Sequence, residues 1–225
     1  MLMTQLAHAA RAAGGAILLS AALLGTGTAT AHADGGSAVM GGGSGIIIDN
    51  LYECTLTTIG YDGAGRLVGL TAGHCGDPGS TVWAEQARGV GPIGKFVHSD
   101  HDLDYAVIQF DPNRVTPVNR IGNTTITNVG QAASFPQVAC KEGRTTGNTC
   151  GIVYGDLFGD QSIWTQMCVV EGDSGAPVVV GNTLVGMVNA YLLVACAGPE
   201  VGTNMGIIMG DINGRGDVGA GFAPV

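Results

Sequence analysis

The sequence predicts an all-β fold of the barrel or sandwich type. The chain has 225 residues, which is enough for one domain or two small ones with a sizeable core. Glycine is abundant, at 39 residues, and only 12% of the residues are charged, a composition that suits many short strands joined by turns. Short apolar segments recur along the chain, and no segment after residue 33 has helical periodicity.

The strand-like segments fall into two groups separated by a polar connection that contains proline. Asp111-Pro112-Asn113 and Thr116-Pro117 form this connection and mark the internal boundary. We therefore expect one half at residues 46–115 and a second half at residues 116–209. The first group comprises Ile46–Ile48, Cys54–Ile59, Leu67–Thr71, Val90–Val97 and Leu103–Phe110, and the second comprises Gln131–Ala139, Gly151–Leu157, Ile163–Val170, Ala176–Val180, Leu184–Leu193 and a last run at Asn204–Met209.

Residues 1–33 have the features of a signal peptide. Arg11 precedes the short apolar stretch Ala12–Leu24, and Ala31-His32-Ala33 has the small residues of a cleavage site. The apolar stretch is interrupted by glycine, whereas a membrane span needs about 20 apolar residues. We expect cleavage after Ala33 and a secreted product without stable membrane insertion; an uncleaved amphipathic anchor is the alternative.

Glycine-rich segments flank the two predicted halves. Residues 34–45 read as a leader, and residues 210–225 read as a loose terminal tail. The tail contains Arg215-Gly216-Asp217, a tripeptide that acts as an adhesion ligand in some exposed loops but that we interpret here as a charged turn.

Charge and cysteine content exclude some functions. The formal net charge of −9 argues against binding to nucleic acid or to an anionic membrane surface. An even number of cysteines in an exported chain favours disulfides, and without a Cys-x-x-Cys pair or a Cys/His cluster we expect no metal site. The six cysteines allow 15 pairings, which the spacing alone leaves open. They are Cys54, Cys75, Cys140, Cys150, Cys168 and Cys196.

The segment Gly172-Asp173-Ser174-Gly175-Ala176 is the candidate nucleophile turn. It lies between the apolar runs Ile163–Val170 and Pro177–Val180, so a sharp glycine turn exposes the serine hydroxyl and neighbouring backbone N–H groups. A serine hydroxyl attacks an amide only with a histidine base and a carboxylate that orients the base. His74 stands at the turn Thr71-Ala72-Gly73-His74-Cys75, and three aspartates follow it at Asp100, Asp102 and Asp104.

Together these motifs resemble the chymotrypsin-like serine proteases, in which histidine, aspartate and serine occur in that chain order. Three further segments resemble the bacterial secreted branch of streptogrisins and alpha-lytic protease. They are the start Val39-Met40-Gly41-Gly42, the loop from Cys140 to Cys150 around Gly143-Arg144-Thr145-Thr146-Gly147, and Cys168 six residues before Ser174. The resemblance implies two packed six-stranded antiparallel β-barrels with the active site in the cleft between them. It also implies the disulfides Cys54–Cys75, Cys140–Cys150 and Cys168–Cys196.

The resemblance implies a serine endopeptidase that needs no metal or organic cofactor. Ser174 is then the nucleophile, His74 the base and Asp104 the orienting carboxylate, because Asp104-Tyr105-Ala106-Val107-Ile108 fits the family pattern; Asp102 is the fallback. The backbone N–H groups of Gly172 and Ser174 would bind the oxyanion. Arg144 is expected to pair with Asp173 and so to preform the site without proteolytic activation.

Two segments are expected to form the substrate pocket. Val169-Val170-Glu171 forms one wall and offers no acid at the pocket base for lysine or arginine, while Asn189-Ala190-Tyr191 forms the other wall, where the tyrosine narrows or roofs the pocket. We therefore expect cleavage of proteins or peptides after small or medium apolar residues, with Glu171 at the rim disfavouring acidic substrates, by a monomeric enzyme. The alternative from a different class is a protease-like binding or adhesion protein that has lost turnover.

Overall fold

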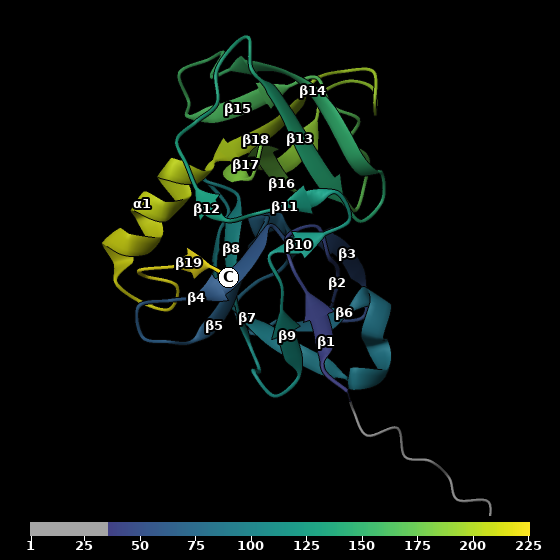
Figure 1. Ribbon diagram of the computed structural model, residues 1–225, viewed down its shortest axis with the longest axis vertical. Coiled ribbons are helices and arrows are strands. Elements are labelled where there is room, and N and C mark those ends of the chain that lie inside the picture. The colour runs from purple at the N-terminus through teal and green to yellow at the C-terminus, as the bar shows by residue number, and fades with distance from the viewer. Residues whose placement is uncertain (1–35) are drawn as a thin grey trace, which may run out of the picture. The chain divides into compact units, whose positions relative to one another are not determined.

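The computed structural model describes residues 36–225, and these residues form two large β-sheets and two short strand pairs (Figure 1). The predicted signal peptide, residues 1–33, and the first residues of the predicted leader lie outside the described residues. Within the described part of the chain, no helix is long and apolar enough to cross a membrane.

The first sheet, in the lower part of Figure 1, has eight strands in the order β19-β4-β5-β8-β7-β6-β2-β3, and every neighbouring pair is antiparallel. The strand Leu67–Thr71, near the centre of the sheet, is buried along its whole length, which explains its nearly continuous apolar sequence. The strands are β2 (Gly45–Ile48), β3 (Tyr52–Thr55), β4 (Thr58–Tyr61), β5 (Leu67–Thr71), β6 (Thr81–Ala84), β7 (Pro92–Asp100), β8 (Tyr105–Phe110) and β19 (Ala223–Pro224).

The second sheet closes into a six-stranded barrel. Its order is β17-β16-β13-β14-β15-β18, and antiparallel pairing of β18 with β17 closes the ring. A short strand, β12 (Asn128–Val129), adds to β17 in parallel. The barrel strands are β13 (Val138–Gly143), β14 (Gly147–Gly155), β15 (Ser162–Thr165), β16 (Pro177–Val180), β17 (Thr183–Tyr191) and β18 (Glu200–Asn204). The predicted all-β, two-barrel fold class is thus confirmed, with the first sheet a curled eight-stranded one.

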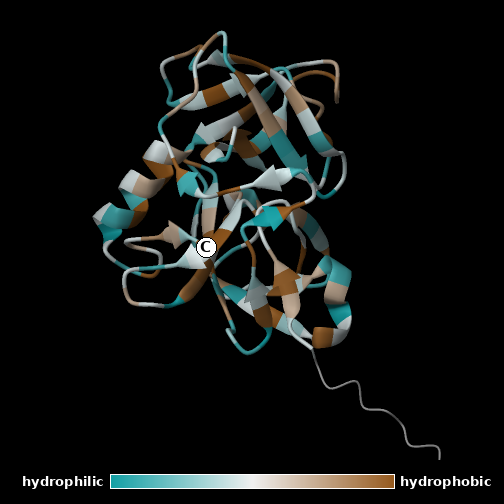
Figure 2. Cartoon of the chain, viewed as in Figure 1, coloured by the Kyte–Doolittle hydropathy of each residue, from teal (hydrophilic) through white to brown (hydrophobic). Residues whose placement is uncertain are grey.

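Apolar side chains form two cores that match these two sheets. The larger cluster lies on the first sheet and includes Phe96, Tyr105 and Ile108. A separate cluster fills the second barrel and includes Val169, Val178 and Val188. Figure 2 shows hydrophobic and hydrophilic residues alternating along several strands, as expected where one face of a strand packs on a core.

The interpretation of the C-terminal region as a strand followed by a loose tail is wrong. Residues Met205–Arg215 form the helix α1, which buries Met205, Ile208 and Ile212 and ends at Gly216 with a left-handed φ of 68°. The chain then returns to the first sheet, where β19 pairs with β4 and Phe222 is buried. Packing of these apolar residues fixes the segment despite its glycine content.

The arginine of the Arg215-Gly216-Asp217 tripeptide points back into the protein. Its Nε lies 3.1 Å from Asp211 Oδ2, and its guanidinium lies 5.9 Å from the centre of the Tyr105 ring. These contacts agree with the interpretation as a structural turn.

The predicted glycine-rich leader contains a strand. β1 (Ala38–Met40) pairs in parallel with β9 (Val115–Pro117). Residues 38–40 are therefore fixed against the segment that was predicted to connect the two halves. The remaining short elements are the hairpin of β10 (Arg120–Ile121) with β11 (Thr124–Thr125), and the 3₁₀ turns η1 (Gly73–Cys75) and η2 (Glu85–Val90).

Candidate active site

The three side chains singled out in the sequence come from turns at the ends of buried strands. His74 lies in η1, directly after β5. Asp104 has a φ of 50° in the turn that leads into β8, and Ser174 lies in the turn before β16. All three follow or precede apolar strands because the strand ends are where the backbone leaves the core and polar side chains can meet.

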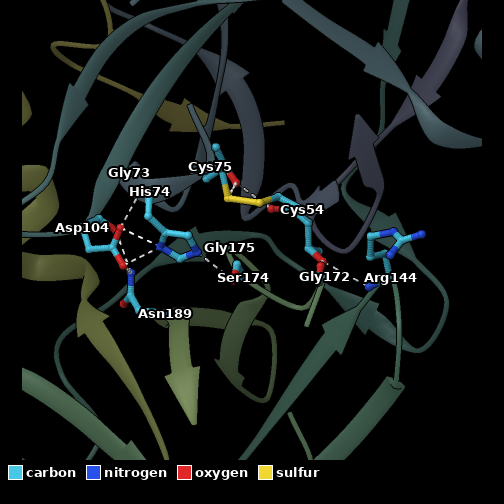
Figure 3. The surroundings of a disulfide bond; sticks show 12 residues. Cys54, Gly73, His74, Cys75, Asp104, Arg144, Gly172, Ser174, Gly175 and Asn189 are labelled. Atoms are coloured by element: carbon cyan, nitrogen blue, oxygen red, sulfur yellow. Dashed lines mark hydrogen bonds and ion pairs between the residues drawn. A yellow bond between two sulfur atoms is a disulfide. The ribbon is translucent and has the colours of Figure 1, made fainter. Parts of the chain in front are cut away.

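These three side chains form one continuous hydrogen-bond chain (Figure 3). His74 Nε2 lies 2.9 Å from Ser174 Oγ, and His74 Nδ1 lies 3.0 and 2.9 Å from the two carboxylate oxygens of Asp104. The backbone N–H of His74 also donates to Asp104 Oδ1 at 2.8 Å. Neither Asp100 nor Asp102 makes such a contact; the carboxylate of Asp100 instead accepts bonds from the backbone of Asp102 and Leu103.

Asp104 has a further donor that the sequence did not reveal. Asn189 Nδ2 lies 2.8 Å from Asp104 Oδ2 and 2.7 Å from its backbone oxygen, and Asn189 Oδ1 accepts from Thr203. Burial alone would raise the pKa of Asp104, but the bonds and charge from His74, with the bond from Asn189, hold that pKa below its ordinary value. Asp104 is therefore ionised at neutral pH.

The serine turn is anchored to the first sheet at the end of β3. Thr55 N donates to Ser174 O at 2.8 Å, and Thr55 Oγ1 donates to Gly172 O at 2.8 Å. The neighbouring Cys54 is linked to Cys75, which follows His74, so one disulfide places the base beside the serine turn (Figure 3). Cys140–Cys150 and Cys168–Cys196 also form, so all three implied pairings are confirmed.

The backbone around Ser174 exposes two donors. In the described residues, the N–H groups of Gly172 and Ser174 donate to no other group of the protein. Gly172 and Gly175 have φ values of 92° and 85°, a conformation that glycine adopts without strain. A Cβ on Gly175 would lie 2.2 Å from Thr55 O, so this turn also requires glycine for space.

The expected pairing of Arg144 with Asp173 is wrong. Asp173 is fully buried, and its ion-pair partner is Lys141, whose Nζ lies 3.3 Å from Asp173 Oδ2. Asp173 also accepts from the backbone N–H groups of Thr145, Thr146 and Val170, at 3.0 to 3.2 Å. Burial lowers the pKa of Lys141, while the charge of Asp173 opposes this shift.

Arg144 points toward the first sheet instead. Its guanidinium pairs with Glu85 and lies 2.8 Å from Glu53. The planar guanidinium of Arg144 presents several N–H donors and pairs with both of these carboxylates at once. Lys141, which is buried on β13, supplies the charge beside Asp173. Lys141 gave no signal in the sequence because it lies in the same disulfide loop as the more conspicuous arginine.

The six residues expected to form the substrate pocket line one cavity of about 250 Å³ together with Ser174. Val169, Val170 and Glu171 form one side, and Asn189, Ala190 and Tyr191 form the other. The ring of Tyr191 packs partly against the core of the second barrel. The two segments that the sequence paired as walls thus meet beside the serine hydroxyl.

Two groups of side chains in the described residues have metal-ligand spacing. In the first, Cys54, His74 and Cys75, both sulfurs are taken by a disulfide. In the second, His98, Asp100 and Asp211, the Asp211 carboxylate already binds the Tyr105 hydroxyl and Arg215. The adjacent guanidinium opposes binding of a cation there.

Comparison with known proteins agrees with this geometry. Residues 43–187 match the family model described as a trypsin-like peptidase domain. Protease A of Thermobifida fusca is similar in structure, with a TM-score of 0.67 and 20% identity over 84% of this chain and 100% of the other. A Nocardiopsis protease has a TM-score of 0.66 and 21% identity over 77% of this chain and 96% of the other. A Cellulomonas bogoriensis chymotrypsin has a TM-score of 0.64 and 23% identity over 84% of this chain and 99% of the other.

The family model covers more than half of the chain, and the solved structures share its two-barrel fold. The resemblance drawn from the sequence motifs is therefore confirmed at the level of the family. The chain belongs to the trypsin-like peptidases, with a fold shared by bacterial chymotrypsin-like proteases.

Proposed function

We propose that this protein is a secreted serine endopeptidase that cleaves proteins or peptides through an acyl-enzyme on Ser174. The observation that carries the proposal is the hydrogen-bond chain from Asp104 through His74 to Ser174 Oγ, beside two unpaired backbone N–H groups. A nucleophile, its base, an orienting carboxylate and oxyanion donors are the full set that acyl transfer needs.

In the proposed reaction Ser174 Oγ attacks the peptide carbonyl carbon as His74 Nε2 takes the hydroxyl proton. The N–H groups of Gly172 and Ser174 stabilise the oxyanion, an interaction whose loss costs about 3 kcal/mol per donor in related chemistry. His74 then protonates the leaving amine, the C–N bond breaks, and the acyl group stays on Ser174. Water attacks the ester, gives its proton to His74, and the proton returns to Ser174 as the acid product leaves.

The cavity beside Ser174 supports a preference for small or medium apolar residues before the scissile bond. Val169, Val170 and Ala190 offer apolar walls, and Tyr191 limits the width of the cavity. Glu171 lines the same cavity and would repel an acidic side chain. Three disulfides and the signal-like residues 1–33 support export, since disulfides persist in oxidising compartments.

Labelling with a fluorophosphonate tests the proposal, because this probe reacts with a serine only when base and oxyanion donors activate it. We expect covalent labelling of the folded protein at Ser174, loss of the label in Ser174→Ala and a strong decrease in His74→Ala. Folded protein that takes no label would refute the enzyme and favour a binding protein on a protease scaffold. Labelling that persists in Ser174→Ala would also contradict the proposal.

A further inference from the structure

Helix α1 is joined by a hydrogen bond to the residue that follows Asp104. Tyr105 is the first residue of β8 and has no exposed surface. Its hydroxyl donates to Asp211 Oδ2 in α1, which lies 106 residues further along the chain. A buried hydroxyl needs an acceptor, because an unpaired one keeps the full cost of leaving water. The C-terminal helix therefore holds the start of the strand that follows the candidate acid.

Neighbouring side chains fix this bond from two sides. Arg215, one turn further along α1, donates from Nε to Asp211 Oδ2 at 3.1 Å, and its guanidinium lies 5.9 Å from the centre of the Tyr105 ring. The ring of His98 lies 5.5 Å from the Tyr105 ring. Burial and the bond to Asp211 raise the pKa of Tyr105, so the phenol stays protonated and keeps donating at neutral pH.

The backbone pairing of β8 ends at Tyr105. The β7–β8 ladder ends with the pair of Asp100 and Tyr105, and the β5–β8 ladder reaches only to Ala106. Asp104, just outside both ladders, has a φ of 50°, which a residue other than glycine seldom adopts. A backbone conformation of this kind persists only where the surrounding contacts hold it. The anchored side chain of Tyr105 provides such a contact.

The backbone of Tyr105 also meets the turn that carries His74. A Cβ on Gly73 would lie 2.9 Å from Tyr105 N and 3.1 Å from Tyr105 O, so η1 packs directly on the Tyr105 backbone. Ser99 Oγ donates to Gly73 O at 2.9 Å and holds the same turn from β7. Figure 3 shows Gly73 and His74 next to Asp104. A shift of Tyr105 would therefore change how the carboxylate of Asp104 faces the imidazole of His74.

We propose that Asp211 is a positioning residue for the candidate active site: through the Tyr105 hydroxyl it fixes the backbone that places Asp104 against His74. The inference rests on the proposed peptidase function and adds helix α1 to the parts of the chain that act on turnover. Asp211 is not one of the described residues that line the cavity beside Ser174. Its effect is therefore on the orientation of Asp104 and not on substrate binding.

Steady-state kinetics with a peptide that has alanine before the scissile bond test this role. Asp211→Ala removes the acceptor, and we expect kcat to fall about tenfold while KM stays within about twofold, because the base loses its orientation and the substrate cavity is unchanged. Tyr105→Phe keeps the ring and removes the donor, so it should show the same loss, and it decides the question if Asp211→Ala does not fold. Since the two changes interrupt one bond, the double variant should be no slower than either single variant.

Two further variants separate positioning from stability. Asp211→Asn keeps an acceptor oxygen for the Tyr105 hydroxyl, so its kcat should stay within about threefold of wild type. Ile208, on the same helix, is fully buried in the larger core, so Ile208→Ala should lower the urea midpoint at least as much as Asp211→Ala. Where both variants are folded, the kcat of Ile208→Ala should remain within about twofold of wild type. A parallel loss of kcat in Ile208→Ala, or an unchanged kcat in Tyr105→Phe, overturns the proposal.

A proton resonance gives a readout that does not depend on turnover. The N–H between His74 Nδ1 and Asp104 forms a charge-assisted bond, and such a proton resonates far downfield when the bond is direct. The resonance should lose intensity or move upfield in Tyr105→Phe and stay in place in Ile208→Ala. An unmoved resonance in Tyr105→Phe overturns the positioning role, while fluorophosphonate labelling of Ser174 leaves the peptidase standing. A resonance that responds in a protein that takes no label would refute the peptidase alone.

Discussion

At the level of single residues, the buried charge beneath the serine turn belongs to Lys141. Its side chain and that of Asp173 have no exposed surface, and Asp173 occupies the position between Gly172 and Ser174 that fixes the oxyanion donors. Arg144, three residues further along the chain, forms its ion pairs with Glu53 of β3 and Glu85 of η2. Lys141 therefore neutralises the buried carboxylate of Asp173, whereas Arg144 links the disulfide loop to the first sheet.

This division predicts opposite outcomes for two matched substitutions. Lys141→Met leaves Asp173 buried without a counter-charge, which costs about 3–5 kcal/mol and should abolish most fluorophosphonate labelling. Arg144→Met removes ion pairs that are partly exposed, so we expect stability within about 1 kcal/mol and labelling close to wild type. Thermal unfolding and the labelling rate check both variants.

If Lys141→Met does not fold, the double variant Lys141→Met/Asp173→Asn separates stability from activity, because it removes both buried charges. A labelling rate that falls more in Arg144→Met than in Lys141→Met would restore arginine as the partner of Asp173.

At the level of elements, the C-terminal segment shows why local propensity misled the interpretation. The helix Met205–Arg215 contains three glycines, at Gly206, Gly210 and Gly214, each of which disfavours a helix. Its buried residues Met205, Ile208 and Ile212 nevertheless follow helical spacing and pack on the larger core. Tertiary contacts therefore stabilise a helix that the composition opposes.

Two substitutions with opposite expected effects on the free energy of unfolding test whether tertiary contacts stabilise this segment. Phe222→Ala should destabilise the protein by about 3 kcal/mol, because the ring is buried against the first sheet and leaves a cavity. Gly210→Ala should stabilise it by up to about 1 kcal/mol, since a Cβ there meets nothing within 4 Å and alanine favours the helix. Chemical denaturation measures both; an unchanged stability in Phe222→Ala would mean that the terminal segment is loose after all.

At the level of the whole molecule, the second barrel encloses two acids and one ammonium. Asp173 and Lys141 neutralise each other, and Glu200 keeps its proton at neutral pH because its pKa is raised to about 8 from an ordinary value of 4.5. The folded state therefore binds more protons than the unfolded state between these two pH values. Stability contributed by Glu200 is fully present below about pH 4.5 and is lost as pH rises through 8.

Glu200→Gln should remove this pH dependence. The amide stays neutral, so the variant and the wild type should have similar free energies of unfolding near pH 5, while the variant should become the more stable one by pH 9. Raising the pKa of Glu200 from 4.5 to about 8 corresponds to a change in the free energy of unfolding on the order of a few kcal/mol across this pH range. Urea unfolding at several pH values checks the prediction, and parallel curves for the two proteins would show that Glu200 is not the titrating group.

Much of the candidate site was accessible from the sequence because its motifs are local. The turns that carry His74 and Ser174 are short, glycine-bearing segments between apolar runs, so their identity and order were readable. Resemblance in these segments also implied the cysteine pairs and the choice of Asp104 over Asp102, and the structure brings Asp104 rather than Asp102 to His74. The pocket wall at Val169–Glu171 directly precedes the serine turn, and the wall at Asn189–Tyr191 lies in the apolar run Leu184–Leu193.

What the sequence determined by itself is which residues stand at strand ends, since periodicity and turn chemistry act over a few neighbouring positions. Only the tertiary structure decided which distant polar side chains meet. Lys141 pairs with Asp173, Asn189 donates to Asp104 of the other sheet, and strand register sets Glu200 opposite Tyr191. Those pairings join residues that are distant in the chain, so they leave no local pattern in the sequence.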